Sequence, residues 1–248
     1  MPEKSARAYI GTSGWHYDHW KGTFYPGDIR TEDMLAHLSG RLSAVEINNT
    51  FYQLPAEGTL SSWADTVPRD FVFCVKASRY VTHMKKLKDP DRTLPNLLER
   101  VDELGNRLGA VLFQLPPNWR ANVDRLRSFL EALPKGMKCA FEFRDESWFN
   151  DSVYQALADY NAAFCIYDME GRQTPRKICA DFVYIRLHGP SERKYQGSYG
   201  NEELSGWAGA ISAWTRAGRD VYCFFDNDQE GHAANNAVSL AGMLSSHG

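Results

Sequence analysis

The stretch Val183–His188, Val-Tyr-Ile-Arg-Leu-His, places an apolar side chain at every second position and a polar one between each pair. Side chains alternate between the two faces of a β-strand, so the three aliphatic residues would share one face and Tyr184, Arg186 and His188 the other. In a closed barrel of parallel strands, one face packs against surrounding helices and the other faces the barrel axis. The stretch therefore predicts a buried strand that carries a tyrosine, an arginine and a histidine toward the axis.

Seven similar runs of β-forming residues accompany this one, and segments of helical character separate them. The eight runs are Ala8–Ser13, Ser43–Asn48, Phe71–Lys76, Ala110–Leu115, Lys138–Phe143, Ala163–Tyr167, Phe182–His188 and Val221–Asp226. The helical segments are Thr31–Leu42, Leu60–Val67, Leu94–Leu108, Val123–Leu133, Ser152–Tyr160, Glu202–Ala217 and Ala233–Leu244. Alternation of strands with helices indicates parallel strands joined by crossover helices, and eight such units in 248 residues fit a closed barrel better than an open sheet.

The link between the sixth and seventh strands, Glu170–Asp181, has the weakest helical pattern because Pro175 interrupts it. No linker rich in Gly, Pro or Ser divides the chain. The sequence therefore predicts one α/β domain over residues 1–248, a single (β/α)8 barrel that is irregular around its sixth and seventh units.

The same alternation in the other strands turns charged and amide side chains toward the axis. In Val45–Asn48, the apolar Val45 and Ile47 suit the helix side, which leaves Glu46 and Asn48 facing inward. Applied to each strand, this pattern predicts an interior set near the C-terminal strand ends: Glu46, Asn48, Lys76, Gln114, Glu142, Arg144, Arg186 and His188. Asp168, Asp226 and Asn227 come at or just after strand ends and would reach the same mouth. Buried charges are costly unless they are paired, so we expect a connected network.

The loops that follow strands one, two, three and seven are long, whereas the links from helices back to strands are short. The long loops are Gly14–Arg30, Asn49–Thr59, Ala77–Thr93 and Gly189–Asn201. In barrel proteins, loops of this kind gather at the C-terminal face, where function is usually built. This face is therefore the predicted location of a site.

Composition and charge narrow the classes of partner. The chain is 43% hydrophobic and 24% charged, which is typical of a soluble globular domain, and its net charge of −3 gives no bulk indication of a nucleic-acid partner. The first residues lack the apolar core of a signal peptide, and no apolar run approaches the ~20 residues of a membrane span. The five cysteines are scattered without a C-x-x-C pair, which favours reduced core thiols. We therefore expect a cytoplasmic protein with no membrane partner.

Several motifs spread over the chain resemble those of one known family. They are Gly11–Pro26, Glu46–Tyr52, Phe73–Ser78 with Thr82 and His83, Phe113–Pro117, Phe141–Arg144 with Ser147 and Trp148, Tyr184–Gly189, and Phe225–Asn227 with Gly231, Asn236 and Ala237. In this order they resemble the YecE-like family, catalogued as domain of unknown function 72, over nearly the whole chain. The resemblance implies a TIM barrel and supplies no activity. Relatives often carry a histidine after the arginine of Phe141–Arg144, where this chain has Asp145, so an acid–base role for that histidine does not carry over.

The interior set favours binding of an anionic or phosphorylated small molecule at the C-terminal mouth, with acid–base chemistry as its reaction. Arginine matches carboxylate and phosphate in a bidentate manner, and the loop after the seventh strand, with Lys194, lies where barrels often hold phosphate. The predicted catalytic residues are Glu46 and Glu142 as general acids or bases, with Lys76 and His188 as proton carriers or electrophiles. The predicted substrate-binding residues are Ser13, Trp15, Asn48, Tyr52, Gln114, Arg144, Arg186, Tyr195 and Asn227. Whether such a site would act as a hydrolase, act as a lyase or only bind stays open.

Three alternatives use the same residues. A metal-dependent phosphoesterase or nuclease-like hydrolase would use ligands among Glu46, Glu142, Asp168, His188 and Asp226, but Lys76, Arg144 and Arg186 would repel the cation, so we predict no metal or other cofactor. Carbohydrate chemistry would use Glu46 and Glu142 with the aromatic loop Trp15–Tyr25. In the third alternative the protein binds a ligand without turnover, or its charged residues only fill the barrel. No P-loop, dinucleotide fingerprint or nucleophile elbow is present.

Overall fold

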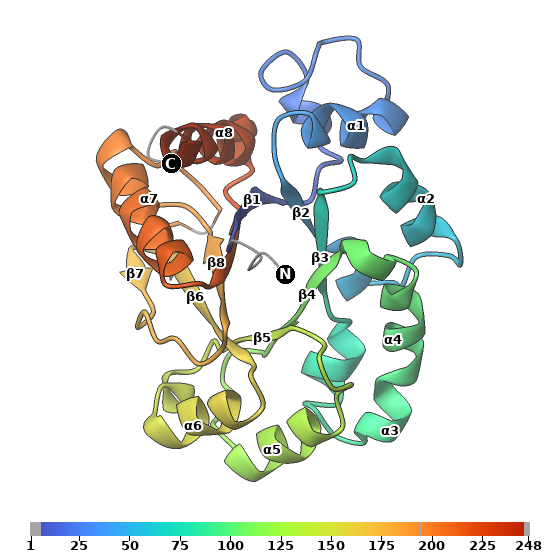
Figure 1. The fold of residues 1–248 in the computed structure, drawn as a ribbon, viewed down its shortest axis with the longest axis vertical. Helices are drawn as coiled ribbons and strands as arrows, with labels where there is room; N and C mark the ends of the chain where they lie inside the picture. Colours follow the sequence, from blue (N-terminus) through green and yellow to red (C-terminus); the bar gives the residue numbers. More distant parts are fainter. Residues whose placement is uncertain (1–5, 194, 246–248) are drawn as a thin grey trace.

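The computed structural model describes residues 6–193 and 195–245, so both ends of the predicted 1–248 domain, and Lys194, lie outside the described residues. Eight parallel strands form the wall of a barrel: β1 (Ala8–Ser13), β2 (Ala44–Ile47), β3 (Val72–Lys76), β4 (Leu108–Gln114), β5 (Cys139–Glu142), β6 (Ala163–Met169), β8 (Phe182–Leu187) and β9 (Asp220–Phe225). Each of these strands pairs with the next, and β9 pairs with β1 (Figure 1). The predicted (β/α)8 barrel is confirmed.

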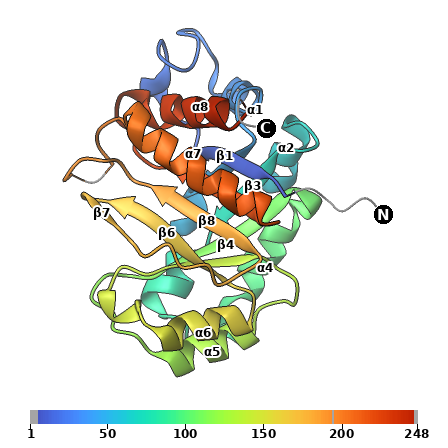
Figure 2. The same ribbon diagram turned by 60° about the vertical axis from the view of Figure 1, so that its left-hand side comes forward.

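Helices surround the strands on the outside of the barrel (Figures 1 and 2). They are α1 (Met34–Ser39), α2 (Thr59–Thr66), α3 (Pro90–Thr93), α4 (Pro95–Asp102), α5 (Val123–Glu131), α6 (Asp151–Asp159), α7 (Asn201–Arg216) and α8 (His232–Ser245). The amide side chains of Asn122 and Asn150 cap α5 and α6 by accepting the backbone N–H groups of Arg125 and Val153. These caps explain why the helices begin where the sequence pattern places them.

The irregular unit lies where the sequence predicts it. After β6 the chain turns into the short antiparallel strand β7 (Arg172–Gln173), which pairs with Asp168 and Met169 (Figure 2). The Tyr167 backbone N–H donates to Thr174 Oγ1 over 2.9 Å, and Thr174 N–H donates back to the Tyr167 carbonyl. Within the described chain no helix joins β6 to β8, because this hairpin and Pro175 take the place of the crossover helix.

The strand wall separates two apolar clusters, as the alternation predicts. Val45, Phe73, Phe141 and Ile185 pack outward with the helices. The inner cluster fills the barrel below the charged strand ends with small and aromatic side chains: Tyr9, Ala44, Cys74, Ala110, Leu112, Ala140, Ala163, Cys165, Phe182, Tyr184, Tyr222 and Phe224. The interior is therefore a packed core at one end, which leaves only the C-terminal end for polar groups.

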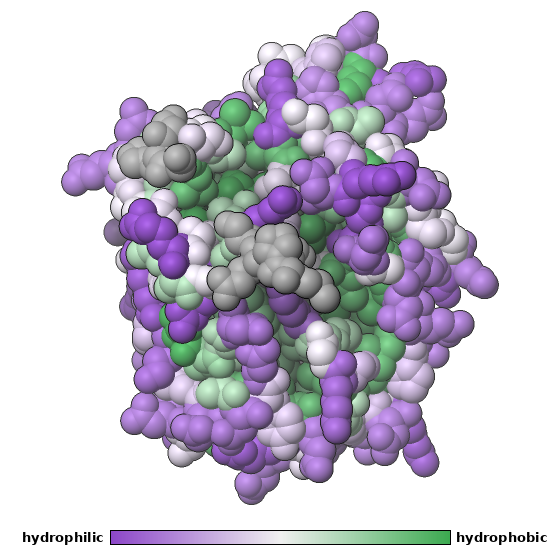
Figure 3. All heavy atoms as spheres, viewed as in Figure 1, coloured by the Kyte–Doolittle hydropathy of each residue, from purple (hydrophilic) through white to green (hydrophobic). Residues whose placement is uncertain are grey.

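The five cysteines are all buried and free. Among the described helices, none has the length and apolar character needed to span a membrane. On the face shown in Figure 3, hydrophilic residues cover most of the outer helices, and hydrophobic residues show in the gaps between them.

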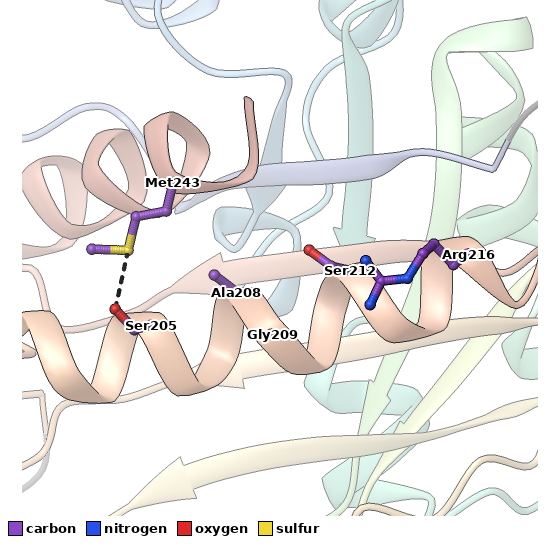
Figure 4. Close-up of a pocket in the computed structure, with 6 residues that line it drawn as sticks. All are labelled: Ser205, Ala208, Gly209, Ser212, Arg216 and Met243. Atoms are coloured by element: carbon purple, nitrogen blue, oxygen red, sulfur yellow. Dashed lines mark hydrogen bonds between the residues drawn. The ribbon is translucent and has the colours of Figure 1, made fainter. Parts of the chain in front are cut away.

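Helices α7 and α8 pack side by side and leave a shallow surface cavity of about 240 Å³ between them (Figure 4). Small side chains of α7 line it, and Ser205 Oγ lies 3.9 Å from Met243 Sδ of α8.

Gly11 offers a test of how tightly the barrel interior is packed. A Cβ atom at Gly11 would lie 2.0 Å from the Ala44 carbonyl oxygen of the neighbouring strand. We expect Gly11→Ala to lower the free energy of unfolding by about 2 kcal/mol, the usual scale of overpacking. The matched control is Gly206→Ala on α7, where a Cβ meets nothing within 4 Å and alanine gains up to ~1 kcal/mol of helix propensity. Equal urea-unfolding curves for the two variants would contradict the packing described.

Candidate functional site

The centre of the barrel mouth is Arg186, whose guanidinium binds three carboxylates from three other strands. Its side chain is 1% exposed. Arg186 Nη2 donates to Glu46 Oε1 over 2.8 Å and Nη1 donates to Glu142 Oε2 over 2.8 Å. Arg186 Nη2 also lies 2.9 Å from Asp226 Oδ2, just after β9. All of its nitrogens are used, because Nε donates to Glu46 Oε1 as well, at 3.1 Å.

Glu46 accepts hydrogen bonds from two hydroxyl groups inside the barrel. Ser13 Oγ donates to Glu46 Oε1 over 2.8 Å, and the Tyr184 hydroxyl donates to Oε2 over 2.7 Å. Both oxygens of this fully buried carboxylate therefore accept hydrogen bonds, which is what a buried charge requires. Glu46 orients Arg186 and does not face the open part of the mouth.

A second layer lies above this pair. Arg144, directly after β5, donates to Glu142 Oε1 and stacks its guanidinium 4.8 Å from the centre of the Tyr167 ring. Its Nη2 lies 3.2 Å from His188 Nε2, while His188 Nδ1 lies 3.0 Å from Asp226 Oδ2. The negative charge of Asp226 beside Nδ1 favours the tautomer with the proton on Nδ1, which leaves the Nε2 lone pair toward Arg144.

The protonation states follow from burial and neighbouring charge. Burial alone would raise the pKa of Glu142, but Arg144 and Arg186 outweigh it and hold that pKa well below its ordinary range. Burial likewise opposes the ionised form of Asp226, but Arg186 and His188 outweigh burial and lower the pKa of Asp226. Burial and then Arg186 lower the pKa of His188, so the imidazole is neutral near pH 7. The layer is thus an ionised network around a neutral histidine.

Lys76, at the end of β3, stands apart from this network. The Thr50 hydroxyl donates to the Lys76 carbonyl over 2.7 Å, and the Lys76 ammonium lies 4.5 Å from the centre of the Phe51 ring. Among residues 6–193 and 195–245, no carboxylate lies within 4.0 Å of its Nζ. Burial, and next the charge of Arg186, lower the pKa of Lys76. It is a half-buried amine without an acidic partner.

Other predicted residues border the mouth or lie outside it. Gln114 is half-buried opposite Glu142 in the register of β4 and β5. The buried Asn48 Oδ1 accepts no hydrogen bond from the described residues. Tyr195 covers His188, with ring centres 5.6 Å apart.

Three predicted binding residues serve other contacts. Trp15 is 3% exposed and packs edge-on against Trp63 of α2, on the helix side. Tyr52 is 78% exposed on the rim. Asn227 donates to the Gly197 carbonyl and to Asn236 Oδ1, which ties the loop after β8 to α8.

The aromatic loop after β1 packs against itself. Trp20 is fully buried, and its Nε1 donates to the Asp228 carbonyl of the loop after β9 over 3.1 Å. Phe24 and Tyr25 are also buried. The loop thus forms part of the rim of the barrel, and these three rings present no open stacking surface.

A cavity of about 310 Å³ opens beside Arg144. Its other lining residues come from the ends of β5 and β6 and from the β7 hairpin, and include Tyr167, Phe149, Met169 and Arg172. The size is at the lower limit of small-molecule sites. Arg144 is therefore the residue that connects the buried carboxylates to open space.

Sequence reasoning did not single out His83, which lies on the π-helical turn η4 (Tyr80–Met84). Its ring packs edge-on against Phe51, 5.0 Å between centres, so His83 and Lys76 share that aromatic ring. Burial, followed by Lys76 and Arg79, lowers the pKa of His83 to about 4. Strand parity cannot place a residue in a loop, and the only available signal was the Thr82-His83 pair in the family motif.

No group of three or more His, Cys, Asp and Glu side chains in the described ranges could hold a metal ion together. The guanidinium of Arg186 occupies the space between the carboxylates that the hydrolase alternative would use. Asp168, another ligand of that alternative, instead accepts from Gln173 of the β7 hairpin.

Removing Arg186 should leave three carboxylates buried without their shared cation. We expect Arg186→Met to lower the free energy of unfolding by about 3–5 kcal/mol, the scale seen when one partner of a buried pair is removed. Arg127→Met is the control, because the Arg127–Asp159 pair has the same 2.8 Å distance but is more than one-third exposed, and should cost at most ~1 kcal/mol. Similar losses in chemical denaturation would show that the buried network contributes little.

The lowered pKa of Glu142 predicts the sign of the pH dependence. A carboxyl whose pKa is lower in the folded state contributes stability above its unfolded pKa, and this is lost as pH falls below ~5. Between pH 6 and pH 3, roughly the range in which unfolded carboxyls titrate, the free energy of unfolding should therefore fall less for Glu142→Gln than for wild type. At pH 6 the variant should already be the less stable of the two. Burial raises the pKa of Asp168, so protonation of this group favours the folded state as pH falls. Asp168→Asn removes that contribution, and its free energy of unfolding should fall more steeply than that of wild type. Parallel curves for wild type and Glu142→Gln would refute the assignment.

Comparisons with known proteins agree with this architecture. The family described as protein of unknown function DUF72 matches residues 9–248. The UPF0759 protein YunF of Bacillus subtilis is 26% identical, over 95% of this chain and 94% of its own, and YecE of Escherichia coli K12 is 28% identical over 57% of this chain and 50% of its own.

Solved structures give the same result. A DUF72 family protein from Thermotoga maritima is 30% identical with a TM-score of 0.87, over 96% of this chain and 99% of its own. One from Enterococcus faecalis, at 18% identity and a TM-score of 0.82 over 96% and 95% of the two chains, shares the fold. The chain belongs to the DUF72 family, whose members are described as proteins of unknown function.

Proposed function

We propose that the C-terminal mouth of the barrel binds an anionic small molecule, carrying a carboxylate or a phosphate, through Lys76 and Arg144. The observation that carries this proposal is that these two cations keep capacity for a ligand, whereas every side-chain nitrogen of Arg186 already donates to a carboxylate. Lys76 has no carboxylate within 4.0 Å in the described chain, and Arg144 forms part of the wall of the 310 Å³ cavity. A guanidinium next to open space is the usual ligand for such anions.

The charge layer beneath explains why Arg186 is not the anion contact. Its nitrogens already donate to Glu46, Glu142 and Asp226, so an anion there would have to displace a carboxylate. Arg144 differs, because its carboxylate partner in the described chain is Glu142. An incoming anion would take over part of its guanidinium, while Glu142 keeps its hydrogen bond from Arg186.

The same exchange supplies the acid–base chemistry of the proposal. When Arg144 turns to the ligand, Glu142 Oε1 and the lone pair on His188 Nε2 lose a donor and become free to accept a proton. Glu142 would act as the general base and His188 would relay the proton, oriented by Asp226 through Nδ1. Glu46, fully bonded below, serves as a positioning residue. This set suits proton abstraction or elimination, which are steps of lyases and of some hydrolases.

The closed network favours one further candidate, a protein that binds the anion without turnover. In that case the layer around Arg186 only holds the mouth in shape. The metal-dependent hydrolase receives no support, since no described ligand set exists, and the carbohydrate alternative lacks an open platform in Trp20, Phe24 and Tyr25.

Thermal stabilisation by oxalate and by inorganic phosphate tests the proposal. We expect wild type to bind at least one of them, and Arg144→Met to weaken binding by about tenfold or more, because a hydrogen bond to a charged group contributes ~1.5–3 kcal/mol. Arg127→Met, on the outer helix α5, should bind as wild type does. The proposal would be rejected if neither anion stabilised the wild type, or if Arg144→Met bound the anion as tightly as wild type does.

A further inference from the structure

We propose that Lys76 is a carbonyl-reactive amine, and that the anion bound at the mouth is a 2-oxo acid, or an aldehyde that carries a carboxylate or phosphate, with which Lys76 forms a reversible imine. This inference rests on the proposed function, since it assigns the anionic group to Arg144 and the carbonyl group to Lys76. It is independent of which group later moves a proton.

The geometry around Lys76 is that of a held, uncommitted amine. Its backbone is fixed by the buried Thr50, whose hydroxyl donates to the Lys76 carbonyl over 2.7 Å and lies 3.1 Å from the Ile47 carbonyl oxygen. The next residue, Phe51, places its ring under the ammonium group at 4.5 Å. The side chain thus reaches the mouth against an aromatic face, without a carboxylate partner in the described ranges. Within the described ranges the ammonium makes this cation–π contact and no ion pair, so its charge is only weakly compensated at a half-buried position.

The charges that face Lys76 come from several elements. Burial and Arg186 of β8 disfavour its protonated form, whereas Glu142 of β5, Asp226 after β9 and Glu46 of β2 favour it. The pKa of Lys76 is lowered, because burial and the charge of Arg186 outweigh the three carboxylates. Desolvation and a neighbouring cation are the two known means of making a lysine nucleophilic.

His83, which packs against the same Phe51 ring, would move the protons that an imine requires. Thr82 Oγ1 donates to the Ser78 carbonyl and lies 3.0 Å from His83 Nδ1. Because the Thr82 hydroxyl proton points to the Ser78 carbonyl, the Thr82 oxygen accepts from Nδ1–H of His83. The lone pair of this histidine is then on Nε2. With a pKa of about 4, His83 is neutral at pH 7 and shares the Phe51 ring with Lys76.

The step itself is balanced. The neutral amine nitrogen of Lys76 attacks the carbonyl carbon, and the nitrogen proton passes to the carbonyl oxygen to give a carbinolamine. Its C–O bond then breaks as one added proton and the hydroxyl leave as water, and the C=N bond of the iminium ion forms. Amine, carbonyl compound and one proton thus give iminium and one water, with no oxidant or reductant. Water reverses the step.

Trapping with borohydride tests the inference on the intact protein. Glyoxylate is the probe, and borohydride reduces its imine to a stable N-carboxymethyl lysine that peptide mass spectrometry locates. Lys85 is the matched control, because it also lies over an aromatic ring, Tyr80, but is 39% exposed and 3.8 Å from Asp89. Burial and Arg186 lower the pKa of Lys76, which raises its neutral fraction at pH 7. We therefore expect Lys76 to be labelled faster than Lys85 at pH 7.

The outcomes separate this inference from the proposed function. Lys76→Arg should abolish the fast label, because a guanidinium forms no imine under these conditions. Fast labelling of Lys76 without oxalate binding would support the imine and reject the anion site. Oxalate binding with labelling of Lys76 no faster than Lys85 would overturn the imine and leave the anion site standing. Fast labelling that persists in Lys76→Arg would place the reactive amine elsewhere and would also overturn it.

Discussion

The structure depends on one guanidinium group. Arg186 joins β8 to β2, to β5 and to the end of β9 through three carboxylates, at a depth where none of these charges could stand alone. The inner core beneath it is apolar and tightly packed, and the mouth above it is polar. Arg186 therefore lies at the boundary between the apolar core and the polar mouth, and it fixes the orientation of Glu46, Glu142 and Asp226.

A buried network of this kind is not an efficient source of stability, because desolvation of the ions offsets most of their attraction. The network instead holds the side chains of the mouth in fixed positions. Glu142 is held between Arg186 below and Arg144 above, and His188 is held between Asp226 and the same two arginines. Arg144 lines the cavity beside the β7 hairpin, and Lys76 has no carboxylate within 4.0 Å in the described ranges. The proposed anion site uses these two cations next to the rigid base that Arg186 and its carboxylates form.

Much of this follows from the sequence, for a physical reason. Strand side chains alternate strictly, so the apolar positions of Val183–His188 determine which side chains enter the barrel, and the same rule places Glu46 and Glu142. The rule stops at the strand ends. Loop residues such as Trp15 and Tyr52 have no parity, and the structure puts the first on the helix side and the second on the exposed rim. The sharing of Phe51 by Lys76 and His83 depends on how two loops fold, which no local pattern encodes.

The central claim, that a saturated Arg186 layer supports an anion site formed by Lys76 and Arg144, is tested most directly by a crystal structure of the protein grown with oxalate. The account predicts oxalate between the Lys76 ammonium and the Arg144 guanidinium, with Arg186 still bonded to Glu46, Glu142 and Asp226. Oxalate bound to Arg186 with one of those carboxylates displaced, or a mouth without oxalate at a saturating concentration, would contradict it.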